Sequence, residues 1–199
     1  MHQYACDPGR FFPSFRKQIE QAPQQWLAAD KNQIIYWLDE LSYISDKPGK
    51  NNETSSLGGG GKSTEALIGL IQSAQREIVM QTPYLIVTEL GHGLLSDAVK
   101  RGVSVKILTN SMLSTDGYAA FAGYQSVRDD LLKSGVELYE FRPDAEVRKT
   151  LLTGPPRLYA DYGLHAKTFT VDGETLMVGT FNLDPRSANL NTEGVVIIK

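Results

Sequence analysis

The stretch HAKTFTVDGETLMVGTFN, residues 165–182, decides the fold of this chain. It contains most of two runs rich in apolar and β-branched residues, LHAKTFTV and ETLMVGTF, on either side of Asp172-Gly173. An Asp-Gly pair between two such runs is a strong signal for a β-hairpin with a tight turn. The stretch therefore predicts two antiparallel strands, and the apolar EGVVIIK at residues 193–199 predicts a further one.

Upstream of the hairpin, helical and strand patterns alternate. Apolar residues at helical spacing over about 64–76, 88–101 and 118–133 precede the strand patterns EIVMQ, VSVKILT and VELYEF. Gly102 and Gly135 stand just past the second and third helical segments, where a left-handed residue caps a helix. Such alternation predicts an α/β fold, with a mixed sheet inside a layered α/β/α domain.

The N-terminal part of the chain lacks this alternation. Residues 11–29 have a helical pattern that Pro23 interrupts, and QIIYWL (33–38) has the composition of a short buried strand. Residues 46–63 are rich in Gly, Pro, Asn and Ser, which is typical of a linker. We therefore expect an N-terminal segment over 1–45 that joins from a missing first half, a linker over 46–63, and a domain over 64–199. We expect residues 142–163 to be irregular and a helix to follow the final strand.

The run GGGGKST at residues 58–64 invites comparison with a phosphate-binding P-loop. A P-loop needs a glycine five positions before the Gly-Lys pair, and it follows a strand. The required position is Ser56, and no strand pattern precedes it. We interpret the run as a flexible linker in which Ser63 or Thr64 caps the next helix.

Composition and charge restrict the class of protein. The 199 residues are 41% hydrophobic and 22% charged, as in a soluble globular protein, and the net charge of -3 gives no basic field for nucleic acid. Cys6 is the only cysteine, so an intrachain disulfide is excluded. No apolar run approaches the roughly 18 residues of a membrane span, and the first residues lack the pattern of a signal peptide.

Polar residues of the hairpin suggest phosphate chemistry. His165 and Lys167 alternate along a strand, which places both on one face about 7 Å apart. An imidazole beside an ammonium group suits a phosphate, because the lysine can bind the anion while the histidine attacks phosphorus. On the partner strand Thr180 and Asn182 share a face, and both can donate hydrogen bonds to phosphoryl oxygens. Each residue also has an ordinary structural explanation, and Asp172 in particular is explained as a turn former.

The spacing H-x-K-x4-D-x6-G-T-x-N from His165 to Asn182 resembles the HKD motif of the phospholipase D superfamily. DPRSANLNTE (184–193) is similar to the segment after the second HKD motif of bacterial cardiolipin synthases, in which a serine often stands at the position of Thr180. The resemblance to the C-terminal half of those synthases also includes LSYISDKPGK (41–50), TPYLIVT (82–88), ILTNSM (107–112) and AGYQSVRDDLLKSGVELYEF (122–141).

This resemblance implies a phospholipase D-like fold and a two-step phosphoryl transfer that needs no metal ion or other cofactor. One histidine attacks the phosphodiester and becomes a phosphohistidine, while a second protonates the leaving alcohol and then activates the incoming alcohol or water. His165 matches the second motif, so the resemblance gives it the acid/base role, with Lys167 and Asp172 as its catalytic companions.

Two further residues match functional positions of the family. Glu193 matches an acidic residue that orients a catalytic histidine, and Tyr84 matches a residue that lines the pocket. The plain alternatives are a charge at the start of a strand for Glu193 and ordinary loop chemistry for Tyr84.

The chain departs from the family pattern in holding one HKD motif, where a complete site needs two. His2 and His92 have no lysine two residues further on. The synthases also carry a histidine near the position of Phe121, so the resemblance leaves the acceptor alcohol open.

Three hypotheses follow. The chain is the C-terminal half of a cardiolipin-synthase-like phosphatidyltransferase, or a single-motif phosphodiesterase or nuclease that pairs with a second copy of itself, or an inert folded half. The first implies an anionic phospholipid substrate, a first HKD half as partner, and peripheral attachment to the bacterial inner membrane. The acidic balance of the chain makes nucleic acid an unfavourable partner.

Overall fold

The computed structural model describes residues 21, 38, 40–50, 60–142 and 163–199. Within them the helices and strands follow in the order β1 (Leu41–Ser45), α3 (Lys62–Ser73), β2 (Glu77–Gln81), α4 (Glu89–Lys100), β3 (Ser104–Asn110), α5 (Tyr118–Lys133), β4 (Glu137–Phe141), β5 (Thr168–Val171), β6 (Thr175–Gly179), α7 (Pro185–Asn189) and β7 (Gly194–Ile198). The chain divides into two units, Met1–Asp39 and Glu40–Lys199, and the sheet lies in the second.

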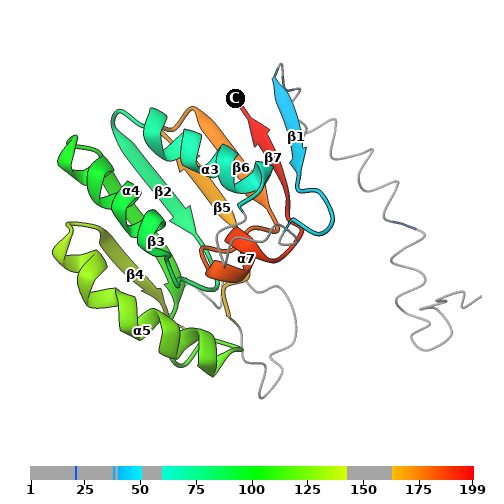
Figure 1. Ribbon diagram of the computed structural model, residues 1–199. Coiled ribbons are helices and arrows are strands. Elements are labelled where there is room, and N and C mark those ends of the chain that lie inside the picture. The colour runs from blue at the N-terminus through cyan, green and yellow to red at the C-terminus, as the bar shows by residue number, and fades with distance from the viewer. Residues whose placement is uncertain (1–20, 22–37, 39, 51–59, 143–162) are drawn as a thin grey trace, which may run out of the picture. The chain divides into compact units, whose positions relative to one another are not determined.

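The described strands form one seven-stranded mixed sheet in the order β1-β7-β6-β5-β2-β3-β4 (Figure 1). β2, β3 and β4 run parallel, whereas β5 is antiparallel to β2 and the strands beyond it alternate in direction. The α/β class and the mixed sheet predicted from the sequence are thus confirmed. The hairpin is also confirmed, since β5 pairs with β6 and both turn residues have positive φ, 56° at Asp172 and 72° at Gly173.

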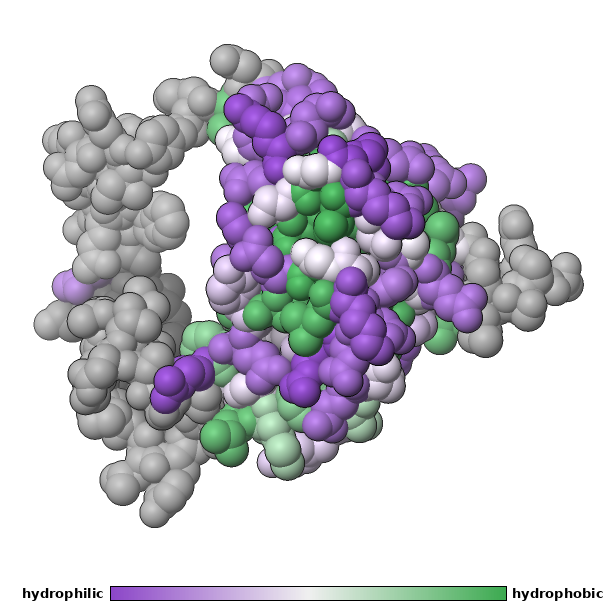
Figure 2. Space-filling model, turned by 90° about the vertical axis from the view of Figure 1, so that its left-hand side faces the viewer, coloured by the Kyte–Doolittle hydropathy of each residue, from purple (hydrophilic) through white to green (hydrophobic). Residues whose placement is uncertain are grey.

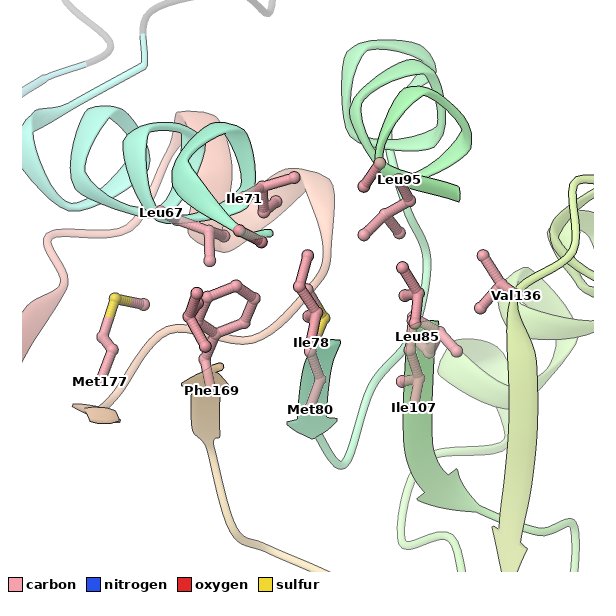
Figure 3. Packing of buried hydrophobic residues seen from close by; sticks show 14 of the residues in the cluster. Leu67, Ile71, Ile78, Met80, Leu85, Leu95, Ile107, Val136, Phe169 and Met177 are labelled. Carbon is pink, nitrogen blue, oxygen red and sulfur yellow. The ribbon is translucent and has the colours of Figure 1, made fainter. Parts of the chain in front are cut away.

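Helices α3, α4 and α5 pack on one face of the sheet (Figure 1). Right-handed crossovers between the parallel strands place α4 and α5 on the same side. Leu67 and Ile71 of α3 and Leu95 of α4 lie over Ile78, Met80 and Phe169 of the strands, and all six are buried (Figure 3). No helix among the described residues covers the opposite face (Figure 1), so a second helical layer stays a prediction.

Helices α4 and α5 end at the two glycines that the sequence analysis expects to cap them. Gly102 has φ 88° and Gly135 has φ 91°, so each adopts the left-handed conformation that ends α4 and α5. At Gly135 an added Cβ would also lie 2.8 Å from a methyl carbon of Val99.

The beginning of the sheet unit differs from the sequence prediction. LSYIS at 41–45 forms edge strand β1, which pairs antiparallel with β7, so the sheet unit starts at Glu40 and not at residue 64. Asp46 to Lys50 also belong to this unit, because Asp46 is hydrogen-bonded to Ser63 and Glu193. Nearly all of the broken helix over 11–29, of the strand over 33–38 and of the irregular stretch over 142–163 lies outside the described residues.

The prediction that Ser63 or Thr64 caps α3 is wrong. The helix begins at Lys62 with Gly61 at its N-cap, and no side chain of the cap residue accepts a hydrogen bond. The carboxylate of Asp46, which lies outside the helix, caps it instead and accepts a hydrogen bond from the Ser63 N–H at 2.9 Å. A Cβ on Gly61 would lie 2.4 Å from Asp46 Oδ1, so glycine gives the carboxylate access to the helix end. An internal carboxylate thus occupies the place that a nucleotide phosphate would need.

Candidate functional site

One edge of the sheet collects most of the polar residues that the sequence singles out. The register pairs Gln81 with Thr168, Gly179 with Val195, and Ser45 with Gly194, so these strand ends lie together. The segments that carry Tyr84, His165, Lys167, Thr180, Asn182 and Glu193 adjoin these ends. The hairpin, the final strand and the end of β2 therefore converge as a site on this edge.

His165 and Lys167 do not lie in a strand, contrary to the prediction, because β5 begins at Thr168. The backbone is held on this course by side-chain and main-chain contacts. Asn110 at the end of β3 accepts from the Leu164 N–H at 2.8 Å and donates to the Leu164 carbonyl at 2.9 Å. The Gly179 N–H donates to the Lys167 carbonyl at 3.2 Å. Asn110 thus replaces a strand partner just before His165.

His165 is exposed and Lys167 is partly buried. The Lys167 ammonium donates to the His165 carbonyl at 3.2 Å. Burial lowers the pKa of Lys167, and the nearby carboxylates of Glu193, Asp116 and Asp184 act in the opposite direction. The cation therefore stands among acidic groups at the edge of the sheet, where it can bind an anion that enters from solvent.

Thr180 and Glu193 are joined directly. The Thr180 hydroxyl donates to the carboxylate of Glu193 and accepts from the Gly194 N–H at 3.0 Å. Glu193 is buried, with 4% of its surface exposed. Burying a carboxylate is costly unless hydrogen-bond donors reach it. The Thr180 hydroxyl is bonded to Glu193, so its contact with a phosphoryl oxygen stays a prediction.

Asn182 brings an unused polar atom to the same edge. Its backbone N–H donates to the Ser187 hydroxyl at 3.1 Å. Its Oδ1 is buried and has no hydrogen-bond partner among the described residues. Since the oxygen and nitrogen of an amide are interchangeable by rotation, this side chain can offer either a donor or an acceptor to a ligand.

Tyr84 also lies at this edge, where it is bonded to Asp116, a residue that the sequence analysis did not single out. Its hydroxyl donates to Asp116 at 2.8 Å, and this bond raises the pKa of Tyr84, with burial as a further cause. Phe121 is half-buried in α5, where its ring packs edge-on against Tyr124 at 5.7 Å between centroids.

Asp172 is not brought together with the other site residues. It lies beyond the last residue of β5, at the opposite edge of the sheet, while His165 precedes the first. Its carboxylate accepts from the N–H groups of Gln75, Arg76 and Glu77 at 2.7 to 2.9 Å. The bond from Glu77 and its neighbours lowers the pKa of Asp172. This geometry supports the turn explanation and gives Asp172 no contact with the site.

An apolar recess lies between α3 and α4, with Leu67, Ile71, Leu94 and Phe181 among its lining residues. Figure 2 also shows a face on which an apolar area is framed by hydrophilic side chains. The described residues include no helix able to span a membrane and no cluster of three or more ligating side chains suited to a metal ion.

The sequence did not indicate the residues that hold the site in place through hydrogen bonds. Asn110 is the last residue of β3, Asp116 follows that strand, and Asp46 follows β1, but each is far from the hairpin in sequence. A polar residue at the carboxyl end of a buried strand is the signal that could have identified Asn110.

The comparisons with known proteins point to one family. A family model described as "Cardiolipin synthase, PLD-like domain" matches residues 67–199. Cardiolipin synthase C of Escherichia coli (strain K12) is 41% identical over 134 residues, which are 67% of this chain and 28% of that protein. Cardiolipin synthase A of Proteus mirabilis (strain HI4320) is 34% identical over 135 residues, or 67% of this chain and 24% of that protein. The chain thus spans about a quarter of the length of these relatives.

A solved structure shows the same fold. Nuc from Salmonella typhimurium, described as a phospholipase D family member, superposes with a TM-score of 0.52 and 22% identity, covering 80% of this chain and 83% of Nuc. Because the family model matches well over half of the chain, the chain belongs to the cardiolipin synthase, phospholipase D-like domain family.

Proposed function

We propose that this chain supplies one half of a phosphatidyl-transferring active site of the phospholipase D type. The other half carries a first HKD motif and belongs to the same enzyme. The donor is an anionic phospholipid, and the phosphodiester lies at the edge of the sheet beside His165 and Lys167. The observation that carries the proposal is the convergence of Lys167, Asn182 and Glu193 at this edge in a chain that is 41% identical to a cardiolipin synthase.

The reaction divides into two steps. A histidine nitrogen of the partner half bonds to phosphorus, and the bond from phosphorus to the leaving alcohol breaks as His165 gives that oxygen its proton. The acceptor alcohol then attacks phosphorus, its proton passes to His165, and the bond to the histidine breaks. His165 ends as it began, so it acts as a general acid and base.

The other polar side chains of the site stabilise the charge on the phosphoryl group and orient a histidine. Lys167 faces the nonbridging oxygens, on which negative charge accumulates in the transition state. The free Oδ1 of Asn182 marks an amide that can turn its nitrogen toward the same oxygens. Glu193 is held by Thr180 and is thereby oriented to accept from a histidine ring nitrogen, which fixes the tautomer of that histidine.

Apolar side chains beside the edge support a lipid substrate and a peripheral position on the bacterial inner membrane. Met112, Leu113 and Tyr118 follow the end of β3, and they are 59%, 78% and 72% exposed. Exposed apolar side chains next to a polar site are typical of surfaces that meet lipid.

The test is a histidine substitution in the complete enzyme, assayed for phosphatidyl transfer. His165→Asn should reduce kcat by about 10³-fold, because a positioned acid and base contributes roughly 10² to 10⁴ in rate. His92→Asn is the matched control, since His92 lies in α4, and it should retain activity. Equal activity of the two variants would place the chemistry elsewhere.

A second candidate is a homodimeric phosphodiesterase in which two copies of the chain pair their single motifs. The chain covers 83% of Nuc, a protein of similar length, whereas it covers only about a quarter of the synthases. Sedimentation of the purified chain separates the candidates. A monomer that gains activity on addition of a first HKD half supports the synthase, whereas a dimer active alone supports the phosphodiesterase. A monomer that stays inactive in both settings would indicate an inert half.

A further inference from the structure

A buried ion pair lies behind the candidate site, on a segment that the sequence predicts to be a linker. Lys50 and Asp46 are joined at 2.6 Å, and only 4% of the Lys50 side chain and 0% of the Asp46 side chain are exposed. Removing two charges from water is costly unless each finds further partners. The further partners are therefore informative.

The partners of Asp46 tie it to Glu193. The Asp46 carboxylate accepts from the Glu193 N–H at 3.0 Å, and the Asp46 N–H donates to the Glu193 carbonyl at 2.9 Å. Both backbone groups of Glu193 are thus held by one residue. The same carboxylate accepts from the N–H and hydroxyl of Ser63, at 2.9 and 2.7 Å, which anchors it to the start of α3.

The partner of Lys50 leads to Asn182. The Lys50 ammonium donates to the Ser187 carbonyl at 2.8 Å, and the Ser187 hydroxyl accepts from the Asn182 N–H at 3.1 Å. Ser187 is fully buried in the short helix α7. The pair therefore contacts Glu193 directly and reaches Asn182 through a single residue.

We propose that Asp46 and Lys50 are positioning residues for the phosphoryl-transfer site. Asp46 fixes the backbone of Glu193, and Lys50 fixes α7 and thereby Asn182. This role rests on the proposed function of the site, and neither residue touches the substrate. Gly61, just before α3, is needed for the same arrangement, because a side chain there would displace the Asp46 carboxylate.

The test compares local mobility with global stability in the 199-residue chain. Lys50→Met removes the charge that holds α7. Asp46→Asn is nearly isosteric and keeps an acceptor for Ser63, but its amide nitrogen cannot accept from Glu193, so it serves if Lys50→Met fails to fold. Tyr124→Phe is the control, since it removes a partly buried hydrogen bond to Glu140 in another part of the sheet. Amide hydrogen exchange is followed at Asn182, Glu193 and the core strand residue Ile107.

In the two variants of the pair, exchange at Asn182 and Glu193 should rise about tenfold or more relative to Ile107, as expected when a charged hydrogen bond is lost locally. Tyr124→Phe should leave that ratio unchanged. If exchange at all three amides rises in step, the pair contributes only to global stability and the proposal is overturned.

Inorganic phosphate binding, measured by titration calorimetry, separates this proposal from the proposed function. If the wild-type chain binds phosphate, the pair variants should bind it about tenfold more weakly or worse, which is the loss typical when residues that orient metal ligands are replaced. Unchanged affinity in the variants would contradict the positioning role. If the wild-type chain binds no phosphate, the proposed site is in doubt, while the exchange ratios still decide whether the pair positions Glu193 and Asn182.

Discussion

The side-chain amide of Asn110 pairs with both backbone groups of Leu164, the residue immediately before His165. It also donates to the Pro83 carbonyl at 3.3 Å, so one buried side chain links the ends of β2 and β3 to the approach to β5. The position of the proposed acid and base is thus set by a residue 55 positions upstream.

Replacing Asn110 should destabilise the segment that leads into β5. Asn110→Asp keeps the acceptor for the Leu164 N–H but loses both donated bonds and buries a charge. The free energy of unfolding of the variant should therefore be about 2 to 3 kcal/mol lower than that of wild type. Urea unfolding measures the change. Asn191→Asp, at a less buried position, is the control and should cost less than about 0.5 kcal/mol. Equal losses in the two variants would show that Asn110 holds nothing in place.

Gly179 should not tolerate a side chain. A Cβ there would lie 2.2 Å from the Gly194 carbonyl oxygen and 2.8 Å from Val195 Cα, both rigid backbone atoms. Gly179→Ala must therefore separate β6 from β7 and should destabilise the chain by about 2 kcal/mol or more. Gly69→Ala, in α3 with open space around it, should instead stabilise by about 0.5 to 1 kcal/mol. Thermal unfolding of both variants gives the comparison, and a stable Gly179→Ala protein would refute the packing of these strands.

Asp46 should make the stability of the chain depend on acid pH. Burial alone would raise its pKa, but hydrogen bonds from Lys50, Ser63 and Glu193 outweigh burial and lower the pKa from 3.8 to about 2. A depressed pKa means that the charged form is stabilised in the folded state, by about 2 kcal/mol. This contribution is complete above about pH 4 and is lost as pH falls toward 2.

The matching variant is Asp46→Asn, which cannot titrate. Its deficit in unfolding free energy relative to wild type should be constant from pH 7 to 5 and should shrink below about pH 4. Urea unfolding across this range gives the result. A deficit that stays constant down to pH 3 would contradict the depressed pKa.

Leu113 should contribute to contact with lipid. It is 78% exposed in the loop after β3, beside the proposed site. Leu113→Ser should weaken co-sedimentation with anionic phospholipid vesicles by about tenfold or more, because burial of a leucine side chain is worth roughly 1.5 to 3 kcal/mol. Leu132→Ser, near the far end of α5, is the control, since Leu132 is also exposed but lies away from the site. Equal binding by wild type and both variants would exclude this loop as the lipid contact.

The sequence allowed most of the sheet to be predicted because its signals are local. Apolar spacing located α4, α5 and their strands within about two residues, and glycines marked the helix ends. β1 was missed because an edge strand that pairs with residues about 150 positions away leaves little local signal. The short helix α7 was missed for a similar reason, since five residues show no helical period.

The sequence predicts which residues belong to the candidate site, but it does not predict the contacts that hold them. His165 and Lys167 are predicted to lie in a strand because alternation continues through them, whereas β5 begins at Thr168 and Asn110 bonds to both backbone groups of Leu164, the residue before His165. The network of Asp46 and Lys50 brings together residues that no motif spacing relates to the hairpin. Such support depends on tertiary contacts, which local patterns do not encode.

The most direct measurement is a crystal structure of the chain assembled with a first HKD half and soaked with vanadate, an analogue of the phosphoryl group. The vanadate should lie within hydrogen-bonding distance of the His165 imidazole and the Lys167 ammonium, with Asn182 turned toward its oxygens. Vanadate bound away from these residues, for example at the start of α3 beside Lys62, would contradict the proposed site.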